Sequence, residues 1–129
     1  QIEFNKNYNN TIMLETDKKR FRQVLINLID YAIKYCRDQD CFTRISFFDM
    51  DENILIEVSD NGLGIDQENI PRIFERFYRT DKGRSREQGG TGLGLAIVKH
   101  IIEAHGQAIN VRSTLGVGTT FGFTLKKAN

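Results

Sequence analysis

An apolar stripe in the segment after Asp17 constrains the fold of this chain more than any other feature of its sequence. Its residues recur at the spacing of one face of an α-helix, and they are Phe21, Val24, Leu25, Leu28, Ile29, Ala32 and Ile33. Asp17 stands just before them, where a carboxylate can cap the first turn. The pattern predicts a helix of about five turns. Because a stripe of this length must be covered by a second layer, the rest of the chain has to supply one.

Strand patterns supply that layer. Short strands are expected at residues 2–8, 11–15, 44–48, 54–59, 107–113 and 119–125. They come in pairs joined by turn formers, and the pairs alternate with helical segments. This order favours an α+β two-layer sandwich with a largely antiparallel sheet over a Rossmann fold.

Two further helical segments and a loop complete the expected order. A strongly amphipathic helix is expected over Leu93–Ala104, and His105-Gly106 can close it. A short helix, kinked or divided by Pro71, is expected from Asp66 towards Phe77. The segment 76–92 shows neither a helical nor a strand period, so it is expected to be a long mobile loop.

Length and composition fit one soluble globular domain. The chain has 129 residues, of which 40% are apolar and 27% charged, and no apolar run is long enough to cross a membrane. A net charge of +1 argues against a general nucleic-acid binder. The sequence opens on a strand-like run without an initiator Met. We therefore expect residues 1–129 to form a single domain cut from a longer protein.

Neither the cysteines nor the histidines have the spacing of a metal site. Cys36 and Cys41 are five residues apart, which matches no metal or redox motif, so two reduced thiols are expected. His100 and His105 are also five apart, a spacing that points them in different directions on a helix.

A glycine-rich stretch, Gly89–Gly94, leads directly into the second amphipathic helix. Glycines let backbone N–H groups converge on an anion, and the start of a helix adds about half a positive charge. The stretch lacks the Gly-Lys-Ser/Thr ending of a P-loop and does not follow a strand, as a dinucleotide fingerprint would. It is therefore either a flexible hinge or a phosphate cradle. A basic flap that precedes it favours a lid over a triphosphate, and its cations are Arg76, Arg79, Lys82, Arg84 and Arg86.

Two more segments are candidate binding elements. Asp60 ends a predicted strand and is followed by Asn61-Gly62-Leu63-Gly64, so its carboxylate could accept from the amine of adenine. An ordinary Asp-Asn-Gly turn is the alternative. Asn27, Tyr31 and Lys34 share one face of the first long helix, with Tyr35 beside them. This polar face either binds phosphate oxygens and Mg²⁺ or faces solvent.

In this order the segments resemble the ATP-binding catalytic domain of two-component sensor histidine kinases, whose wider fold is shared with gyrase, Hsp90 and MutL. The resemblance covers essentially the whole chain. The matching segments are NLIDYAIKY (27–35), DNGLGI (60–65), IFERFYR (73–79), GGTGLGLAIVKHIIEAHG (89–106) and GVGTTFGFTL (116–125). It implies a Bergerat-type fold, with a mixed, mostly antiparallel sheet of about five strands covered on one face by three helices. Among these kinases the chain is similar to the phosphate-responsive PhoR type.

The resemblance also implies roles for individual residues. Asp60 would bind the adenine amine, Gly62, Gly64 and Ile65 would shape the base pocket, and Thr119 would support its adenine end. Asn27 and Lys34 would be the catalytic residues that contact phosphates, Asn27 would also hold Mg²⁺, and Tyr35 would lie near the ribose. Candidate phosphate contacts from the loop are Arg76, Arg79, Lys82 and Gln88. Backbone N–H groups would come from Gly90, Thr91, Gly92, Leu93 and Gly94. Phe74 and Phe77 would anchor the lid or contact the partner domain.

One position departs from the family pattern. Tyr31 stands where the family has the asparagine that is its main protein ligand for Mg²⁺. A neutral phenol is a poor ligand for this metal. Losing one hydrogen bond to a charged group costs about 1.5–3 kcal/mol, which corresponds to an affinity roughly tenfold to a hundredfold lower. Asp30 lies about 100° around the helix and is not expected to substitute. The chain is therefore expected to be either an impaired kinase or a nucleotide-binding pseudokinase.

The resemblance finally implies cofactors and partners. The chain would bind ATP with Mg²⁺ and donate the γ-phosphoryl to a histidine on a separate helical dimerisation domain of the same protein, and a response regulator would act downstream. The isolated domain would be monomeric. The full-length bacterial kinase would be a membrane-anchored homodimer whose catalytic domains face the cytoplasm, without a nucleic-acid partner.

Overall fold

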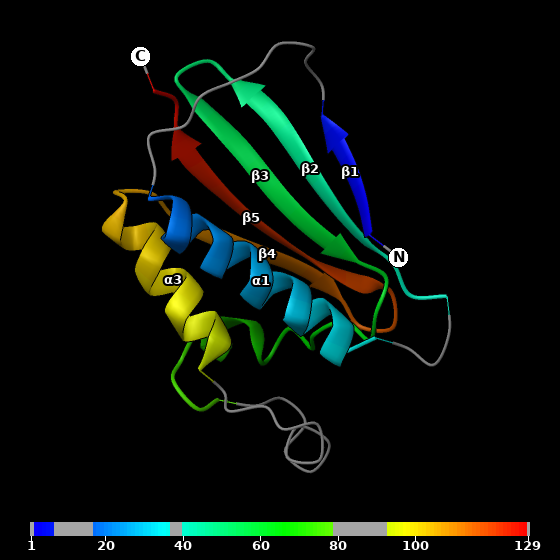
Figure 1. Cartoon of the computed structure of the whole chain (residues 1–129). Helices are drawn as coiled ribbons and strands as arrows, with labels where there is room; N and C mark the ends of the chain where they lie inside the picture. Colours follow the sequence, from blue (N-terminus) through cyan, green and yellow to red (C-terminus); the bar gives the residue numbers. More distant parts are fainter. Residues whose placement is uncertain (1, 7–16, 37–39, 79–92, 129) are drawn as a thin grey trace.

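The chain forms a five-stranded sheet with the strand order β1-β2-β3-β5-β4. The computed structural model describes residues 2–6, 17–36, 40–78 and 93–128. The strands are β1 (Ile2–Lys6), β2 (Thr43–Met50), β3 (Asn53–Asp60), β4 (Ile109–Thr114) and β5 (Gly118–Lys126). β1 pairs with β2 in parallel, and the other neighbours are antiparallel (Figure 1). The predicted mixed, mostly antiparallel sheet is therefore confirmed.

Two α-helices lie side by side on one face of this sheet (Figure 1). α1 (Lys18–Lys34) begins at Asp17, whose Oδ1 accepts hydrogen bonds from the backbone N–H groups of Lys19 and Arg20 at 2.9 and 3.3 Å. α3 (Gly94–Ala104) ends at His105, and Gly106 follows with a φ of +74°. No helix within the described ranges is long and apolar enough to cross a membrane.

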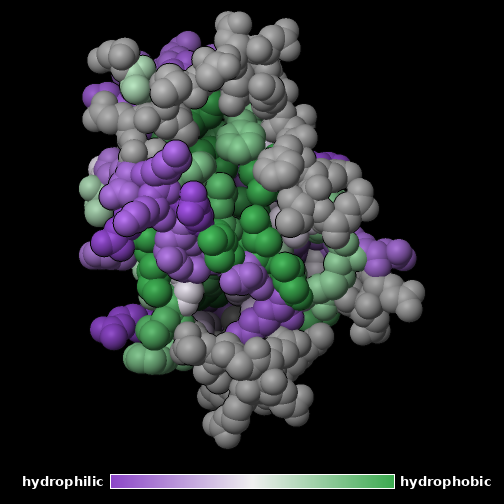
Figure 2. Space-filling model, viewed as in Figure 1, coloured by the Kyte–Doolittle hydropathy of each residue, from purple (hydrophilic) through white to green (hydrophobic). Residues whose placement is uncertain are grey.

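The apolar stripe of α1 packs on the sheet as its spacing predicts, with one exception. Val24, Leu28 and Ala32 are buried, and Phe21, Leu25 and Ile29 pack against the same core. Ile33 is 62% exposed, so its predicted burial is wrong. It follows Ala32 by about 100° around the helix axis, which turns it past the covered face. Figure 2 shows hydrophobic surface running between the hydrophilic groups of this helical face.

The third predicted helix is much shorter than expected. In the segment from Asp66 to Phe77 the described structure has only the 3-10 turn η1 (Ile70–Arg72), with Pro71 inside it. Pro71 cannot donate a helical hydrogen bond, which limits the turn to short-range pairing. Within the described residues, the layer that covers the sheet thus consists of two α-helices and this turn, where three helices were expected. The predicted strand at 11–15 and most of the predicted loop, residues 79–92, lie outside the described residues.

The two cysteines are joined, in contrast to the expected free thiols. A disulfide links Cys36, just beyond α1, to Cys41, just before β2, with their Cα atoms 5.8 Å apart. Spacing alone could not show this. The approach of the two residues depends on how the end of α1 meets the start of β2.

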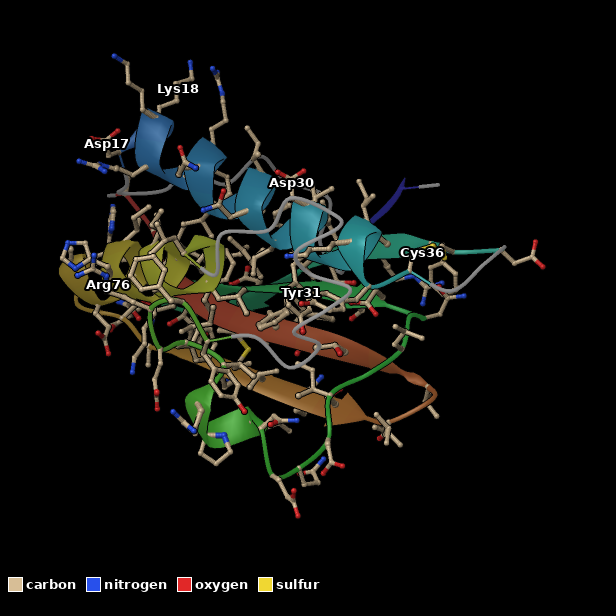
Figure 3. All side chains as sticks on the ribbon, turned by 90° about the horizontal axis from the view of Figure 1, so that it is seen from below. Asp17, Lys18, Asp30, Tyr31, Cys36 and Arg76 are labelled. Carbon is tan, nitrogen blue, oxygen red and sulfur yellow. A yellow bond between two sulfur atoms is a disulfide. The ribbon has the colours of Figure 1, made fainter. Side chains whose placement is uncertain are left out.

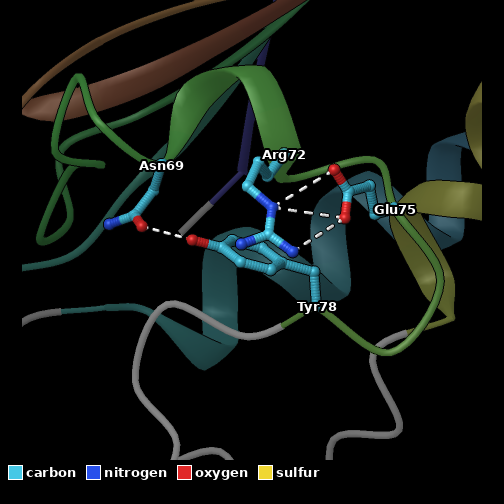
Figure 4. Close-up of polar contacts among 4 residues, drawn as sticks. All are labelled: Asn69, Arg72, Glu75 and Tyr78. Carbon is cyan, nitrogen blue, oxygen red and sulfur yellow. Dashed lines mark hydrogen bonds and ion pairs between the residues drawn. The ribbon is translucent and has the colours of Figure 1, made fainter.

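The segment after η1 is held by a small polar cluster (Figure 4). The guanidinium of Arg72 forms an ion pair with Glu75 at 3.1 Å and lies over the ring of Tyr78. The hydroxyl of Tyr78 donates to Oδ1 of Asn69. Phe77, which directly precedes Tyr78 in this segment, has a φ of +64° and is 63% exposed. The left-handed region is unfavourable for a bulky residue, so the surrounding contacts must hold Phe77 there.

Replacing Phe77 by glycine should therefore stabilise the domain relative to alanine. A non-glycine residue in this region costs about 1–2 kcal/mol, and the chain entropy of glycine offsets part of that gain. Urea unfolding should give Phe77→Gly a free energy of unfolding about 1 kcal/mol above that of Phe77→Ala. Both variants lose the same exposed ring, so alanine is the matched control. An alanine variant as stable as the glycine variant would contradict the left-handed backbone conformation of Phe77.

Candidate functional site

Asp60 is the last residue of β3 and lies at one end of the sheet. It pairs with Thr43 of β2 and Thr119 of β5, both of which are buried. The backbone N–H of Gly62 donates to its Oδ1 at 2.8 Å. Burial raises the pKa of the Asp60 carboxyl, and backbone hydrogen bonds from Gly62 and Thr119 oppose that rise. The result is a half-buried carboxylate in a fixed orientation.

The turn after Asp60 packs against two other backbone segments with no room for side chains. A Cβ on Gly62 would lie 2.4 Å from the carbonyl oxygen of Tyr35, and one on Gly64 would lie 2.2 Å from that of Thr114. A Cβ on Gly118 would lie 2.0 Å from the carbonyl oxygen of Asp60. The end of α1, the turn after β3 and the β4–β5 hairpin therefore meet here. Gly62 and Gly64, which were predicted to shape a pocket, are required by this close approach.

A hydroxyl pair locks the hairpin to the turn. Oγ of Ser113 accepts from the backbone N–H of Ile65 at 2.7 Å and donates to the carbonyl of Gly118 at 2.9 Å. Its single proton is thereby used, so the hydroxyl of Thr119 donates to it across 2.8 Å. Two predicted site residues, Ile65 and Thr119, thus lie close to Asp60. Ser113 was not predicted, although it faces Thr119 across the hairpin.

Asn27 connects α1 to the start of α3. Its Nδ2 donates to the carbonyl of Gly94 at 3.2 Å, and its Oδ1 accepts from Nε2 of Gln23 at 2.9 Å. Leu93 and Gly94 begin α3, so the structure brings the polar residue of α1 and the end of the glycine-rich stretch together. A Cβ on Gly94 would meet no described atom within 4 Å. Gln23 was not among the predicted site residues.

Tyr31 points from α1 towards the sheet. Its ring lies 4.6 Å from the ring of Tyr35 and 5.3 Å, edge to face, from the ring of Phe121 in β5. Burial, with smaller contributions from Tyr35 and Asp60, raises the pKa of the Tyr31 phenol far above its ordinary value. Figure 3 shows Asp30 on the outer side of α1 and Tyr31 on the sheet side. Tyr31 is therefore an aromatic core contact, and the predicted polar face is only partly polar.

The remaining predicted residues divide into three groups. The ammonium of Lys34 lies 5.5 Å from the centre of the Tyr35 ring, and this ring in turn contacts the ring of Tyr31. Arg76 lines a groove together with Gln23 of α1, Lys99 of α3 and the predicted site residue Leu93. The rest lie outside the described residues, namely Arg79, Lys82, Gln88, Gly90, Thr91 and Gly92.

Asn61 fastens the disulfide-linked segment to the turn after β3. Its Oδ1 accepts from the backbone N–H of Phe42 at 2.9 Å, and its Nδ2 donates to the carbonyl of Asp40 at 2.8 Å. Leu63 donates in turn to the carbonyl of Tyr35 at 3.0 Å. Asn61 is thus a structural residue beside Asp60 that the sequence did not single out. An Asp-Asn-Gly turn was the only signal for it.

Comparison of this chain with known proteins agrees with this geometry. Residues 16–129 match the family described as histidine kinase-, DNA gyrase B- and HSP90-like ATPase. The chain is 42% identical over 126 residues to the sensor histidine kinase WalK of Bacillus subtilis, covering 96% of this chain and 21% of WalK. It is 40% identical to the sensor histidine kinase YkoH of the same organism, covering 95% of this chain and 28% of YkoH. The chain thus spans about a quarter of the length of these curated relatives.

Solved structures extend the agreement to the fold. The catalytic domain of histidine kinase ThkA superposes with a TM-score of 0.80 at 32% identity, covering 99% of this chain and 82% of that one. Full-length ShkA, solved in complex with AMPPNP, gives a TM-score of 0.80 at 30% identity, covering 98% of this chain and 26% of ShkA. Both the sequence match and the shared fold extend over nearly all of the chain. It therefore belongs to the histidine kinase-, DNA gyrase B- and HSP90-like ATPase family, as a histidine kinase catalytic domain.

Proposed function

We propose that this chain binds ATP with its adenine against Asp60 and donates the γ-phosphoryl to a histidine on a separate helical domain. The observation that carries the proposal is the half-buried Asp60 carboxylate, oriented by the Gly62 backbone in a turn whose two glycines leave no room for a Cβ. An ionised carboxylate can accept about four hydrogen bonds, so acceptor capacity is left for an exocyclic amine. Partial burial of a carboxylate costs folding free energy, and groups buried at such a cost are often found in binding sites.

The other predicted residues support the same placement. Tyr35, at the end of α1, accepts from Leu63 in the turn after Asp60, and Lys34 lies over its ring, so both are placed to contact a ribose or the first phosphates beyond the base. Asn27 holds the start of α3, whose N-terminal N–H groups favour an anion. A Cβ built on Gly94 would have no described atom within 4 Å, so a ligand could approach the Gly94 backbone from that side. Arg76, the predicted lid cations Arg79 and Lys82, and the amide of Gln88 would contact the phosphates.

A second candidate function is a nucleotide-binding pseudokinase. The packing of Tyr31 into the aromatic core favours it, because position 31 then provides no amide for phosphate or metal. In this case ATP would bind, but transfer to the acceptor histidine would be slow or absent.

The relatives also support a proposal for the partners of the whole protein. The sensor kinases among them suggest a helical phosphoacceptor domain in the same protein and a response regulator downstream. A membrane-anchored bacterial homodimer with this domain in the cytoplasm is the corresponding arrangement. The PhoR-type assignment rests on the FERFYR and SREQGGTGLGLAIVKHIIEAH segments alone, whereas the similar curated proteins are WalK and YkoH kinases, so a WalK-like kinase is the better supported description.

Replacing Asp60 by asparagine should weaken nucleotide binding without weakening the fold. The variant loses a charged hydrogen bond worth about 1.5–3 kcal/mol, so calorimetry should show ATP bound about tenfold to a hundredfold more weakly. Because burial disfavours the ionised carboxyl, the free energy of unfolding at neutral pH should be no lower than that of the wild type.

The matched control for this variant is Asp30→Asn, which removes the same charge from the outer side of α1. It should bind ATP as the wild type does. The wild type should also bind ATP more tightly than GTP, because guanine presents a carbonyl oxygen where adenine has its amine. Unchanged ATP affinity in Asp60→Asn would rule out the proposed adenine contact.

Phosphoryl transfer should require a separate acceptor. When the domain is mixed with the helical phosphoacceptor domain of a WalK-type kinase and γ-labelled ATP, the label should appear on the helical domain. A domain that binds ATP but transfers no label would support the pseudokinase alternative. Label on His100 or His105 of this chain would contradict both.

A further inference from the structure

The most informative departure in this molecule is the side chain of Tyr31. It occupies the position at which the resemblance to sensor histidine kinases implies a metal-binding amide. Its ring is committed to Tyr35 and to Phe121, which is only 1% exposed. Burial raises the pKa of its phenol, so the anionic form that could attract a cation is disfavoured. Position 31 therefore provides aromatic surface in place of an oxygen ligand.

The neighbouring oxygen donors on α1 do not replace that ligand. Mg²⁺ requires near-octahedral oxygen coordination and is usually held by one or two carboxylates. The Asn27 carbonyl oxygen already accepts from Gln23, and its amide nitrogen is bound to Gly94. Asp30, the one carboxylate beside Tyr31 in sequence, is exposed on the outer side of α1 (Figure 3). Within the described part of the chain, the donor set on this face does not fit a protein-coordinated Mg²⁺.

The protein itself places positive charge on this face of α1. The ammonium of Lys34 lies over the Tyr35 ring, one turn from Tyr31. The start of α3, an eleven-residue helix, is tied to the same face through Asn27. A helix N-terminus contributes roughly half a positive charge. A more highly charged, metal-free nucleotide would interact with these groups at least as strongly as its Mg²⁺ complex.

We infer that this domain binds its nucleotide without a metal ion coordinated by the protein, and that the Tyr31 ring forms a wall of the nucleotide site between α1 and β5. The inference rests on the proposed ATP site and adds to it the ligand form, a free nucleoside triphosphate anion. Tyr31 acts as a specificity-determining residue in this account. It replaces a polar contact with the metal by an aromatic contact with the ligand's base or ribose.

The test compares ATP affinity in Mg²⁺ and in EDTA by isothermal titration calorimetry on the wild-type domain. We expect the two dissociation constants to agree within about threefold, or EDTA to give the tighter binding. Tightening by Mg²⁺ of more than about threefold would overturn the inference and leave the ATP site intact. If ATP binds in neither buffer, the proposed ATP site fails, and this inference fails with it.

Three variants sharpen the result. Tyr31→Asn should introduce metal dependence, with Mg²⁺ tightening ATP binding at least fivefold. Tyr31→Phe keeps the ring and loses the hydroxyl, so its ratio of affinities in the two buffers should stay within threefold. Ile33→Asn introduces the same amide at an exposed position of α1 and is the matched control, without metal dependence. Metal dependence in Tyr31→Phe would show that the hydroxyl, and not the ring, decides the result, which overturns the inference. If Tyr31→Asn does not fold, the wild type and Tyr31→Phe still decide.

Discussion

The close approach of three backbone segments at the end of β3 is the constraint on which the rest of the site depends. Gly62 faces the carbonyl of Tyr35, Gly64 that of Thr114, and Gly118 that of Asp60, each at a distance that excludes a Cβ. This contact fixes the end of α1 and the β4–β5 hairpin relative to the turn after Asp60. Because all three positions lack side chains, the backbone itself defines one end of the site, and Asp60 is held at its edge.

Contacts between aromatic rings form a second boundary of the candidate site. Tyr31, Tyr35 and Phe121 connect α1 to β5, and Phe74 reaches the same core residue from the segment after η1, with ring centres 6.1 Å apart. Phe121 thus links the helical layer, the sheet and the segment that leads to the predicted lid. A change at position 31 therefore affects this packing and, in the proposed nucleotide site, ligand contact as well.

The elements with strong periodicity could be predicted from the sequence, and the contacts between distant elements could not. The α1 stripe, the β2–β3 and β4–β5 hairpins and α3 follow from spacing and turn residues, and Asp60 and its glycines follow from their place at a strand end. Ser113 and Asn61 were missed because their partners lie on other segments of the chain. Gln23 was missed although its partner Asn27 lies one turn further along the same helix, because a Gln four residues before an Asn is ordinary on a helix surface. The disulfide and the direction of Tyr31 depend on the same tertiary arrangement. The helix expected after Asp66 was too long because only one 3-10 turn forms around Pro71.

The most direct test of the central claim is a paired measurement on Gly118→Ala and Gly116→Ala. Both glycines have a left-handed φ, but a Cβ on Gly118 would overlap the Asp60 carbonyl, whereas one on Gly116 would meet no described atom within 4 Å. If the close approach defines the site, Gly118→Ala should lose at least about 2 kcal/mol more unfolding free energy than Gly116→Ala. It should also lose ATP binding that Gly116→Ala retains. Equal stability and equal ATP affinity in the two variants would contradict the account.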